Sequence, residues 1–296
     1  MNRRQGIAIL MGVGALFGAN HVAARLAIDH GASVAAAVAT RSGCTALFLL
    51  AFLKAQGASF AMPRLTLLRA LGVGALVATQ SFCLYSAVAR IPVALALLVF
   101  QICPMLYILL SWALGKEKPA TRVFLVIPLA LVGLALVLDI YGKAGDMAGR
   151  WREIGEGVLW ALAAAASFTL VFFFNVHWLK ALDGRLRTFV MMAVTATLVV
   201  AGGAAAGALA LPHVATGWTG LAALTLLYGT AITTLFSVLP RLAAAGDTSS
   251  TVALNFEPIA VLGIAWIVLG QAVAPLQILG AFIVVGALAW LGLARK

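Results

Sequence analysis

The amino-acid sequence predicts an all-α membrane protein with ten transmembrane helices in a 5+5 inverted repeat. Hydrophobic residues make up 64% of the 296 positions and charged residues only 10%, against roughly 25% charged residues in an average soluble domain. Apolar stretches of the length that crosses a hydrocarbon core, about 20 residues, recur along the chain. Residues of the two halves also correspond at a nearly constant separation.

Ten apolar stretches are the predicted spans: 6–26, 34–53, 67–89, 92–114, 120–138, 155–178, 187–209, 217–239, 249–270 and 275–294. The first is too long for the apolar core of a signal peptide, so we expect it to be retained. A glycine-rich, charged segment lies between the fifth and sixth stretches. The chain therefore divides into a first five-helix repeat (1–140), a connecting loop (141–154) and a second five-helix repeat (155–296).

The repeat is indicated by residues of the same type at matching positions. The separation is 154 positions for Pro104 and Pro258 and for Trp112 and Trp266, 155 for Gly115 and Gly270, and 153 for Gly133 and Gly286. With five spans in each half, the second half starts on the opposite side of the membrane, which makes the repeat inverted. Inverted repeats recur in secondary transporters, whose sites lie near the bilayer midplane.

The distribution of Lys and Arg predicts the orientation. With the N-terminus in the cytoplasm, 14 of these residues fall on the inner side and 5 on the outer side, with Arg41 inside a span. This bias favours a multi-pass membrane protein with both termini cytoplasmic, and we expect it in a bacterial inner (plasma) membrane. The net charge of +11 is scattered over short loops and forms no basic face, so we expect a lipid bilayer and no nucleic acid as a partner.

The sequence contains no recognisable catalytic or cofactor motif. Cys44, Cys83 and Cys103 occur singly in apolar runs, without the spacing of a metal site. Neither a Walker A sequence, an HExxH motif nor a nucleophile with a partnered base is present. We therefore predict no catalytic residue, no metal, no cofactor and no enzymatic activity. An intramembrane enzyme is the alternative from another class, and a passive channel is a third.

Arg41, Glu257 and His21 fall well inside predicted spans, where each needs an explanation. Arg41 could bind the carboxylate of a ligand, or it could snorkel or brace the bundle. Glu257 could bind an ammonium group, carry a proton or brace the helix break at Pro258. The two could also pair across a cavity. His21 could relay protons or simply pack.

Amides and prolines occupy corresponding positions of the two halves. Pro104 and Pro258 predict helix breaks at equivalent depths of spans 4 and 9, either as part of a transport motion or as static kinks. Gln101 and Asn255 each precede a proline by three residues, and Asn20 lies late in span 1. These amides could hydrogen-bond a ligand or join helices.

Several aromatic residues could form ring-stacking walls around a ligand or could face lipid and the helix core. Among these, Tyr85 and Trp160 are expected near the outer interface, where amphipathic rings gather. The candidates are Phe17, Phe82, Tyr85, Phe100, Trp160, Phe168 and Tyr228.

These residues resemble a known family. The stretch from Ala96 to Leu138, with Pro104, Gly115-Lys116-Glu117 and Gly133, is similar to the fourth and fifth helices of EamA-type members of the drug/metabolite transporter superfamily. The stretch from Leu254 to Leu293 looks like the same unit repeated. The run from Leu16 to Arg25 resembles the first helix of that family, and Arg41 stands where its second helix often carries Arg. One departure is Gly270-Gln271, where the family has Gly-Glu.

The resemblance implies a secondary transporter that exports small metabolites, above all amino acids, with the first four helices of each half around a central cavity. The fifth and tenth helices would brace the structure. The branch most similar to this sequence exports aromatic amino acids, and efflux of drugs or lipophilic cations is the alternative. We expect a small-molecule substrate and either a monomer or a homodimer. The predicted substrate-binding residues are Phe17, Asn20, His21, Arg41, Tyr85, Phe100, Gln101, Trp160, Phe168, Tyr228, Asn255 and Glu257.

Overall fold

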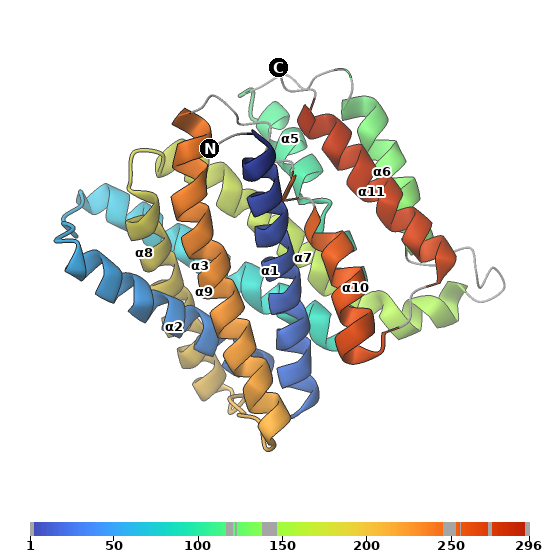
Figure 1. Cartoon of the computed structure of the whole chain (residues 1–296), viewed down its shortest axis with the longest axis horizontal. Coiled ribbons are helices and arrows are strands. Elements are labelled where there is room, and N and C mark those ends of the chain that lie inside the picture. Colours follow the sequence, from blue (N-terminus) through green and yellow to red (C-terminus); the bar gives the residue numbers. More distant parts are fainter. Residues whose placement is uncertain are drawn as a thin grey trace.

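The computed structural model describes residues 3–116, 121, 123–137, 147–244, 253–254, 256–271 and 274–293, and these form a bundle of α-helices (Figure 1). No strand occurs among the described residues. The helices are α1 (Arg3–Asp29), α2 (Val34–Ala55), α3 (Arg64–Arg90), α4 (Val93–Phe100), α5 (Cys103–Ala113), α6 (Val123–Val137), α7 (Met147–Trp178), α8 (Gly184–Ala205), α9 (Ala215–Ala244), α10 (Glu257–Leu269) and α11 (Pro275–Leu293).

Local sequence signals set the helix ends. Ser33 precedes α2, and its hydroxyl accepts a hydrogen bond from the N–H of Ala36 at 3.1 Å, which satisfies one of the N–H groups that a helix start leaves free. Asp183 caps α8 in the same way. After α2 the chain turns at Gly57 with a φ of 63°, a conformation that suits glycine.

Two helices begin at a proline inside a predicted span. The fourth predicted span consists of α4, which ends at Phe100, and α5, which begins at Cys103 and has Pro104 in its first turn. Pro258 has the same place in α10, which starts at Glu257 instead of residue 249. The first turn is where proline fits best, because the N–H it lacks would have no acceptor there.

The sixth helix starts earlier than the sequence predicts. Helix α7 already begins at Met147, within the segment 141–154 that we assigned to a connecting loop. Residues 138–146 lie outside the described residues. This end of α7 contains Arg150, Trp151 and Arg152, so its hydropathy is too low to mark it as part of a span.

The described helices have the length and composition of membrane spans. Seven segments are long and apolar enough to cross a membrane: Gln5–Asp29, Val34–Ala55, Arg64–Arg90, Val93–Ala113, Ile154–Trp178, Gly184–Ala205 and Ala215–Phe236. Three shorter apolar helices, Val123–Leu136, Glu257–Leu269 and Pro275–Trp290, account for the other predicted spans. Large apolar side chains such as Leu226 and Ile267 point outward, 69% and 74% exposed, as expected of a surface in contact with lipid.

Helix α1 lies inside the bundle, between α9 and α10 (Figure 1). Helix α2 packs on α8, α3 packs on α7 and α8, and α4 contacts α7 and α10. Helices α6 and α11 pack on each other at one side of the molecule (Figure 1). Helix α1 starts and α11 ends at the same end of the bundle (Figure 1).

Glycines allow α1 to approach its neighbours closely. A Cβ atom on Gly18 would lie 2.8 Å from Cγ2 of Val261 in α10, and one on Gly220 of α9 would lie 2.7 Å from the backbone nitrogen of Ala27. Small residues at such positions bring helix backbones together where no hydrophobic effect drives helix association. The residues of α1 that face α9 and α10 are thereby held at short range from those helices.

Candidate functional site

Helix α1 contributes one side of a buried polar cluster. Phe17, His21 and Arg25 are spaced by four residues and therefore lie along one face of the helix. Asn20 is fully buried and His21 is 7% exposed. Most polar side chains inside a bundle need partners, and those of α1 are found on α3 and α10.

The guanidinium of Arg41, on α2, lies at the centre of this cluster. Its side chain is buried, with the residue 5% exposed, and it donates hydrogen bonds to the hydroxyl of Tyr85 at 3.1 Å and to that of Ser81 at 2.9 Å. The cation also lies against two aromatic rings, 5.1 Å from the ring centroid of Tyr85 and 4.3 Å from that of Tyr228. Such contacts attract a cation to the ring face. Arg41 is therefore held in place by neutral groups.

Tyr85 joins three helices. It is buried with no exposed surface, so its ring lies inside the bundle and does not face lipid. Its hydroxyl is 3.3 Å from Nδ2 and 3.4 Å from Oδ1 of Asn20, in addition to its contact with Arg41. Helices α1, α2 and α3 thus meet at one phenol oxygen.

Glu257 pairs with His21 and not with Arg41. Nε2 of His21 is 3.3 Å from Oε1 of Glu257, which is the first residue of α10. The His21 ring also contacts the ring of Tyr85 edge-on, with 5.8 Å between ring centroids. A carboxylate at a helix N-terminus is stabilised by the helix dipole. The possible pairing of Arg41 with Glu257 is not formed in this structure.

The cluster leaves buried polar atoms without partners. Within the part of the chain that the structure describes, no carboxylate lies within 4 Å of Arg41. Nε of Arg41, the hydroxyl of Ser42 and Nδ1 of His21 are buried and form no hydrogen bond among the described residues. Burying a charge is costly unless it is paired. The arrangement is therefore suited to accept an anionic group from a ligand.

Six of the seven predicted aromatic residues, all except Tyr85, form three separate pairs. Phe17 contacts Tyr228 at 5.9 Å between ring centroids, which places it beside Arg41. Phe100 contacts Phe168 at 5.5 Å, next to the break between α4 and α5. In the third pair Trp160 contacts Phe82, and its indole N–H donates to Glu156 at 3.3 Å. Only the first pair is joined to Arg41 by these contacts.

Asn20 and Gln101, the two predicted amides among the described residues, have different partners. Asn20 belongs to the cluster around Tyr85. Gln101 lies at the break between α4 and α5, half-buried, where its N–H donates to the carbonyl of Leu97. Asn255 lies outside the described residues, so the suggested correspondence between Gln101 and Asn255 remains a prediction.

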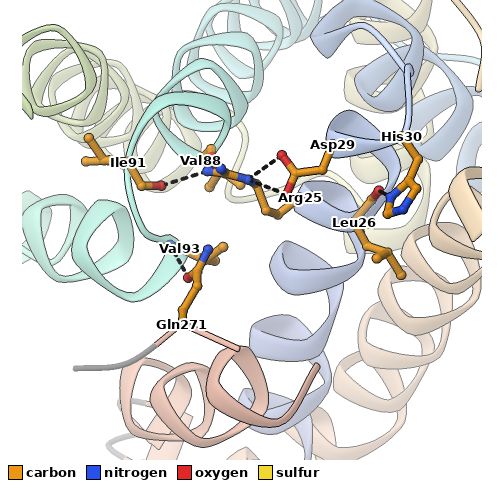
Figure 2. A network of polar contacts seen from close by, with 8 residues as sticks. All are labelled: Arg25, Leu26, Asp29, His30, Val88, Ile91, Val93 and Gln271. Carbon is orange, nitrogen blue, oxygen red and sulfur yellow. Dashed lines mark hydrogen bonds and ion pairs between the residues drawn. The ribbon is translucent and has the colours of Figure 1, made fainter. Parts of the chain in front are cut away.

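A second polar network, which the sequence did not reveal, fixes one end of the bundle (Figure 2). Arg25 donates to the backbone carbonyls of Val88 at 2.7 Å and Ile91 at 3.1 Å, where α3 ends, and pairs with Asp29 at 2.7 Å. A cation is favourable at the C-terminal end of a helix. Arg25 therefore ties α1 to the end of α3, one turn beyond His21.

Gln271 belongs to the same network (Figure 2). Its amide oxygen accepts a hydrogen bond from the N–H of Val93, the first residue of α4, at 3.1 Å. This contact joins α10 to α4 across the two halves of the chain. The Gln271 amide therefore caps the start of α4, and a carboxylate at position 271 could do the same.

Sequence reasoning missed two further members of the Arg41 cluster, Ser81 and Gln80. Ser81 precedes Tyr85 by four residues on α3, so both hydroxyls face α2, and Ser81 also donates to Oε1 of Gln80 at 3.3 Å. The signal was available in the sequence, since a Ser and a Tyr spaced by one helical turn inside a span form a polar face that needs a partner.

Comparison with known proteins supports a multi-pass membrane protein. Residues 4–139 match the EamA-like transporter family, a little under half of the chain. No curated protein matches the chain. A solved structure titled "Crystal structure of protein" is 19% identical, with a TM-score of 0.65 over 99% of this chain and 98% of that chain. At this identity the likeness concerns the fold alone.

Proposed function

We propose that the whole chain belongs to the EamA-like transporter family of the drug/metabolite transporter superfamily and is a secondary transporter that exports amino acids. The match of residues 4–139 to that family supports this assignment. The likeness in fold to a solved structure covers 99% of the chain, so both halves belong to one fold. The protein would reside in a bacterial inner membrane with both termini in the cytoplasm, which agrees with α1 starting and α11 ending at the same end of the bundle (Figure 1).

The packing of the helices supports a 5+5 inverted repeat over 1–140 and 155–296. The spans of the first half are α1, α2, α3, α4 with α5, and α6, and their counterparts in the second half are α7, α8, α9, α10 and α11. Exchanging each span for its counterpart turns the contact of α1 with α9 into a contact of α7 with α3, and these helices also pack together. The pair α1 and α10 becomes α7 with α4 and α5, again in contact, while α2 with α8 and α6 with α11 exchange onto themselves. A pseudo-two-fold axis produces this pattern, and such repeats allow alternating access to a site between them.

The observation that carries the substrate assignment is the unpaired cation of Arg41. A ligand carboxylate would accept a hydrogen bond from the free Nε of Arg41. Glu257 supplies an anion that is linked to Tyr85 through His21, and a ligand ammonium group could bind to it. An amino acid carries both groups. The rings of Phe17, Tyr85 and Tyr228 around Arg41 favour an aromatic side chain.

Transport by purified protein in liposomes tests this assignment. We expect uptake of labelled tryptophan above that of empty liposomes, competition by phenylalanine and none by a lipophilic cation. Arg41→Gln should abolish uptake, whereas Arg69→Gln, an Arg on α3 that contacts the ring of Trp178, should not. Faster uptake into liposomes preloaded with unlabelled tryptophan is expected of a carrier and not of a passive channel.

Efflux of lipophilic cations is the second candidate. Glu257 and the neighbouring aromatic rings could bind a cation without help from Arg41. Uptake of the labelled cation with no entry of tryptophan, unchanged by Arg41→Gln, would favour that function and contradict the amino-acid proposal.

A further inference from the structure

We propose that Arg69 and Trp178 form a binding site for the phosphate of an anionic phospholipid, at the end of the bundle where α3 begins and α7 ends. The guanidinium of Arg69 lies 5.5 Å from the ring centroid of Trp178. Arg64 begins α3 and Lys180 follows α7, so two further cations belong to the same end. This inference is independent of the proposed substrate.

The opposite end of α3 has the same arrangement of an Arg over a Trp, completed by a carboxylate. There Arg90 of α3 lies 5.7 Å from the ring centroid of Trp160 of α7. Arg90 also pairs with Glu156 at 2.6 Å, and the indole N–H of Trp160 donates to the same carboxylate at 3.3 Å. One anion therefore accepts hydrogen bonds from both members of this Arg–Trp pair.

Arg69 and Trp178 have no such anion within the part of the chain that the structure describes. No described carboxylate pairs with Arg69, and neither its guanidinium nor the indole N–H of Trp178 forms a hydrogen bond with a described residue. Asp183, in the connection between α7 and α8, is paired with Arg185 at 2.8 Å. The donors of the Arg69–Trp178 pair are therefore available to an anion from outside the chain.

Arg64 and Lys180 add positive charge to this end. Arg64 lies five residues before Arg69, about 7.5 Å further out along the helix, and Lys180 lies two residues after Trp178. Both are exposed, and neither has an ion pair among the described residues. Each Lys or Arg near an anionic membrane surface contributes about fivefold to affinity. The end of α3 and α7 therefore attracts anionic headgroups over neutral ones.

The surface of α3 around Arg69 is apolar, which favours a lipid over a soluble phosphate. Leu65, Leu68 and Leu71 are exposed. Gly72, one turn from Arg69 toward the bilayer centre, has no atom within 4 Å of the position that its Cβ would take, so an acyl chain can lie there below a phosphate at Arg69. The predicted orientation places this end at the cytoplasmic leaflet, where anionic lipids make the membrane surface negative.

Quenching by brominated lipid tests the site in vesicles that contain the full-length protein. Vesicles of phosphatidylcholine receive a small fraction of lipid with brominated acyl chains, either phosphatidylglycerol or phosphatidylcholine. Bromine quenches a tryptophan that a labelled chain touches, and the signal of Trp178 is the difference between the wild-type protein and Trp178→Phe. We expect brominated phosphatidylglycerol to occupy the site at a lower fraction than brominated phosphatidylcholine, by about fivefold for each cation at the site.

Two variants locate the preference, with the same subtraction made in each. Arg69→Gln should reduce the preference for phosphatidylglycerol at Trp178 by about fivefold, through loss of one cation. Arg90→Gln, at the matching Arg that pairs with Glu156, should retain it. The signal of Trp160, obtained with Trp160→Phe, should show no preference, because the carboxylate of Glu156 already binds that Arg–Trp pair.

Three results would overturn the inference. Equal quenching of Trp178 by the two brominated lipids would mean that Arg69 only snorkels to the interface. A preference for phosphatidylglycerol that is as strong at Trp160, or unchanged in Arg69→Gln, would mean a general attraction to the charged protein and no site. Loss of the preference on addition of inorganic phosphate, but not of sodium chloride at the same ionic strength, would assign the site to a soluble phosphate. None of these results bears on the amino-acid substrate, so the two proposals are tested separately.

Discussion

Replacing Arg41 with methionine distinguishes a ligand-binding arginine from one that braces the fold. Methionine fills a similar volume without the charge. The substitution removes two hydrogen bonds and two contacts with aromatic rings. The groups left behind keep partners, since Tyr85 still contacts Asn20 and Ser81 still contacts Gln80. The buried cation, which no described carboxylate neutralises, disappears together with the several kcal/mol that its desolvation costs.

The lost contacts lower the stability of the Arg41→Met protein, and removal of the buried charge raises it. Ligand binding, by contrast, should only be weakened. Charge-assisted hydrogen bonds contribute about 1.5–3 kcal/mol each and cation–π contacts about 0.5–1 kcal/mol, which is comparable to the desolvation of an unpaired buried charge. Replacing buried charged groups by apolar ones of similar volume is often neutral or stabilising by about 1–4 kcal/mol. We therefore expect the melting temperature of the ligand-free Arg41→Met protein to stay the same or to rise, by up to about 8 °C at roughly 2 °C per kcal/mol.

Thermal unfolding with and without tryptophan measures both effects. A ligand at a hundred times its Kd stabilises the wild-type protein by about 2.7 kcal/mol, a rise of about 5 °C at roughly 2 °C per kcal/mol, and it should not stabilise Arg41→Met. Arg41→Lys should lie in between, because Lys keeps the charge but not the planar donor array. A fall of more than about 4 °C in the ligand-free Arg41→Met protein, about 2 kcal/mol, would mean that Arg41 is a structural brace, and the reasoning for a ligand carboxylate would fail.

Three further outcomes follow from contacts elsewhere in the bundle. Gly18→Leu should lower the melting temperature by several degrees, because its Cβ would lie 2.8 Å from a side chain of α10, whereas Gly12→Leu, with no atom within 4 Å, should be tolerated. Gln271→Glu should stabilise the protein by about 0.3–1 kcal/mol, because a carboxylate at the start of α4 interacts favourably with the helix dipole. Gln271→Ala should destabilise it. Equal melting temperatures for the wild-type protein and both variants would show that Gln271 does not cap α4. The hydrogen bond from the Arg185 side chain lowers the pKa of Asp183 to about 2 from 3.8, so its contribution to stability is present above about pH 4 and is lost as the pH falls through about 2. Asp183→Asn should lack that part of the acid dependence in urea unfolding, and an unchanged dependence would refute the assignment.

The span positions were predictable because hydropathy responds to the thickness of the bilayer core. Helices α2 and α3 lie within three residues of the stretches 34–53 and 67–89 at each end. The interruption between α4 and α5 could be expected from Pro104, because proline marks a helix start even where the apolar run continues. The start of α7 at Met147 could not, since its charged first turns lie outside any apolar run.

The side chains of the site were predictable one by one, but their pairing was not. Arg41, His21 and Glu257 are conspicuous because charged and titratable groups are rare in spans. The sequence left open a pairing of Arg41 with Glu257 across a cavity, but rise per residue gives no information on which way each helix face turns. The close approach of α1 to α10 at Gly18 brings His21 to Glu257 instead.

The phenol of Tyr85 has a consequence for how this protein can evolve. Because Asn20, Arg41 and Tyr85 share one hydroxyl, the effects of substitutions at these three positions depend on one another and will not add. A change at one position shifts the set of residues tolerated at the other two, so variation there should be correlated among descendants of this sequence. Tyr228 touches Arg41 through its ring face, and its hydroxyl contacts only the sulfur of Met192 among the bonds found, at 3.8 Å. Substitutions on the α9 side of the cluster are therefore coupled to Arg41 and Phe17 through ring contacts and not through the shared hydroxyl.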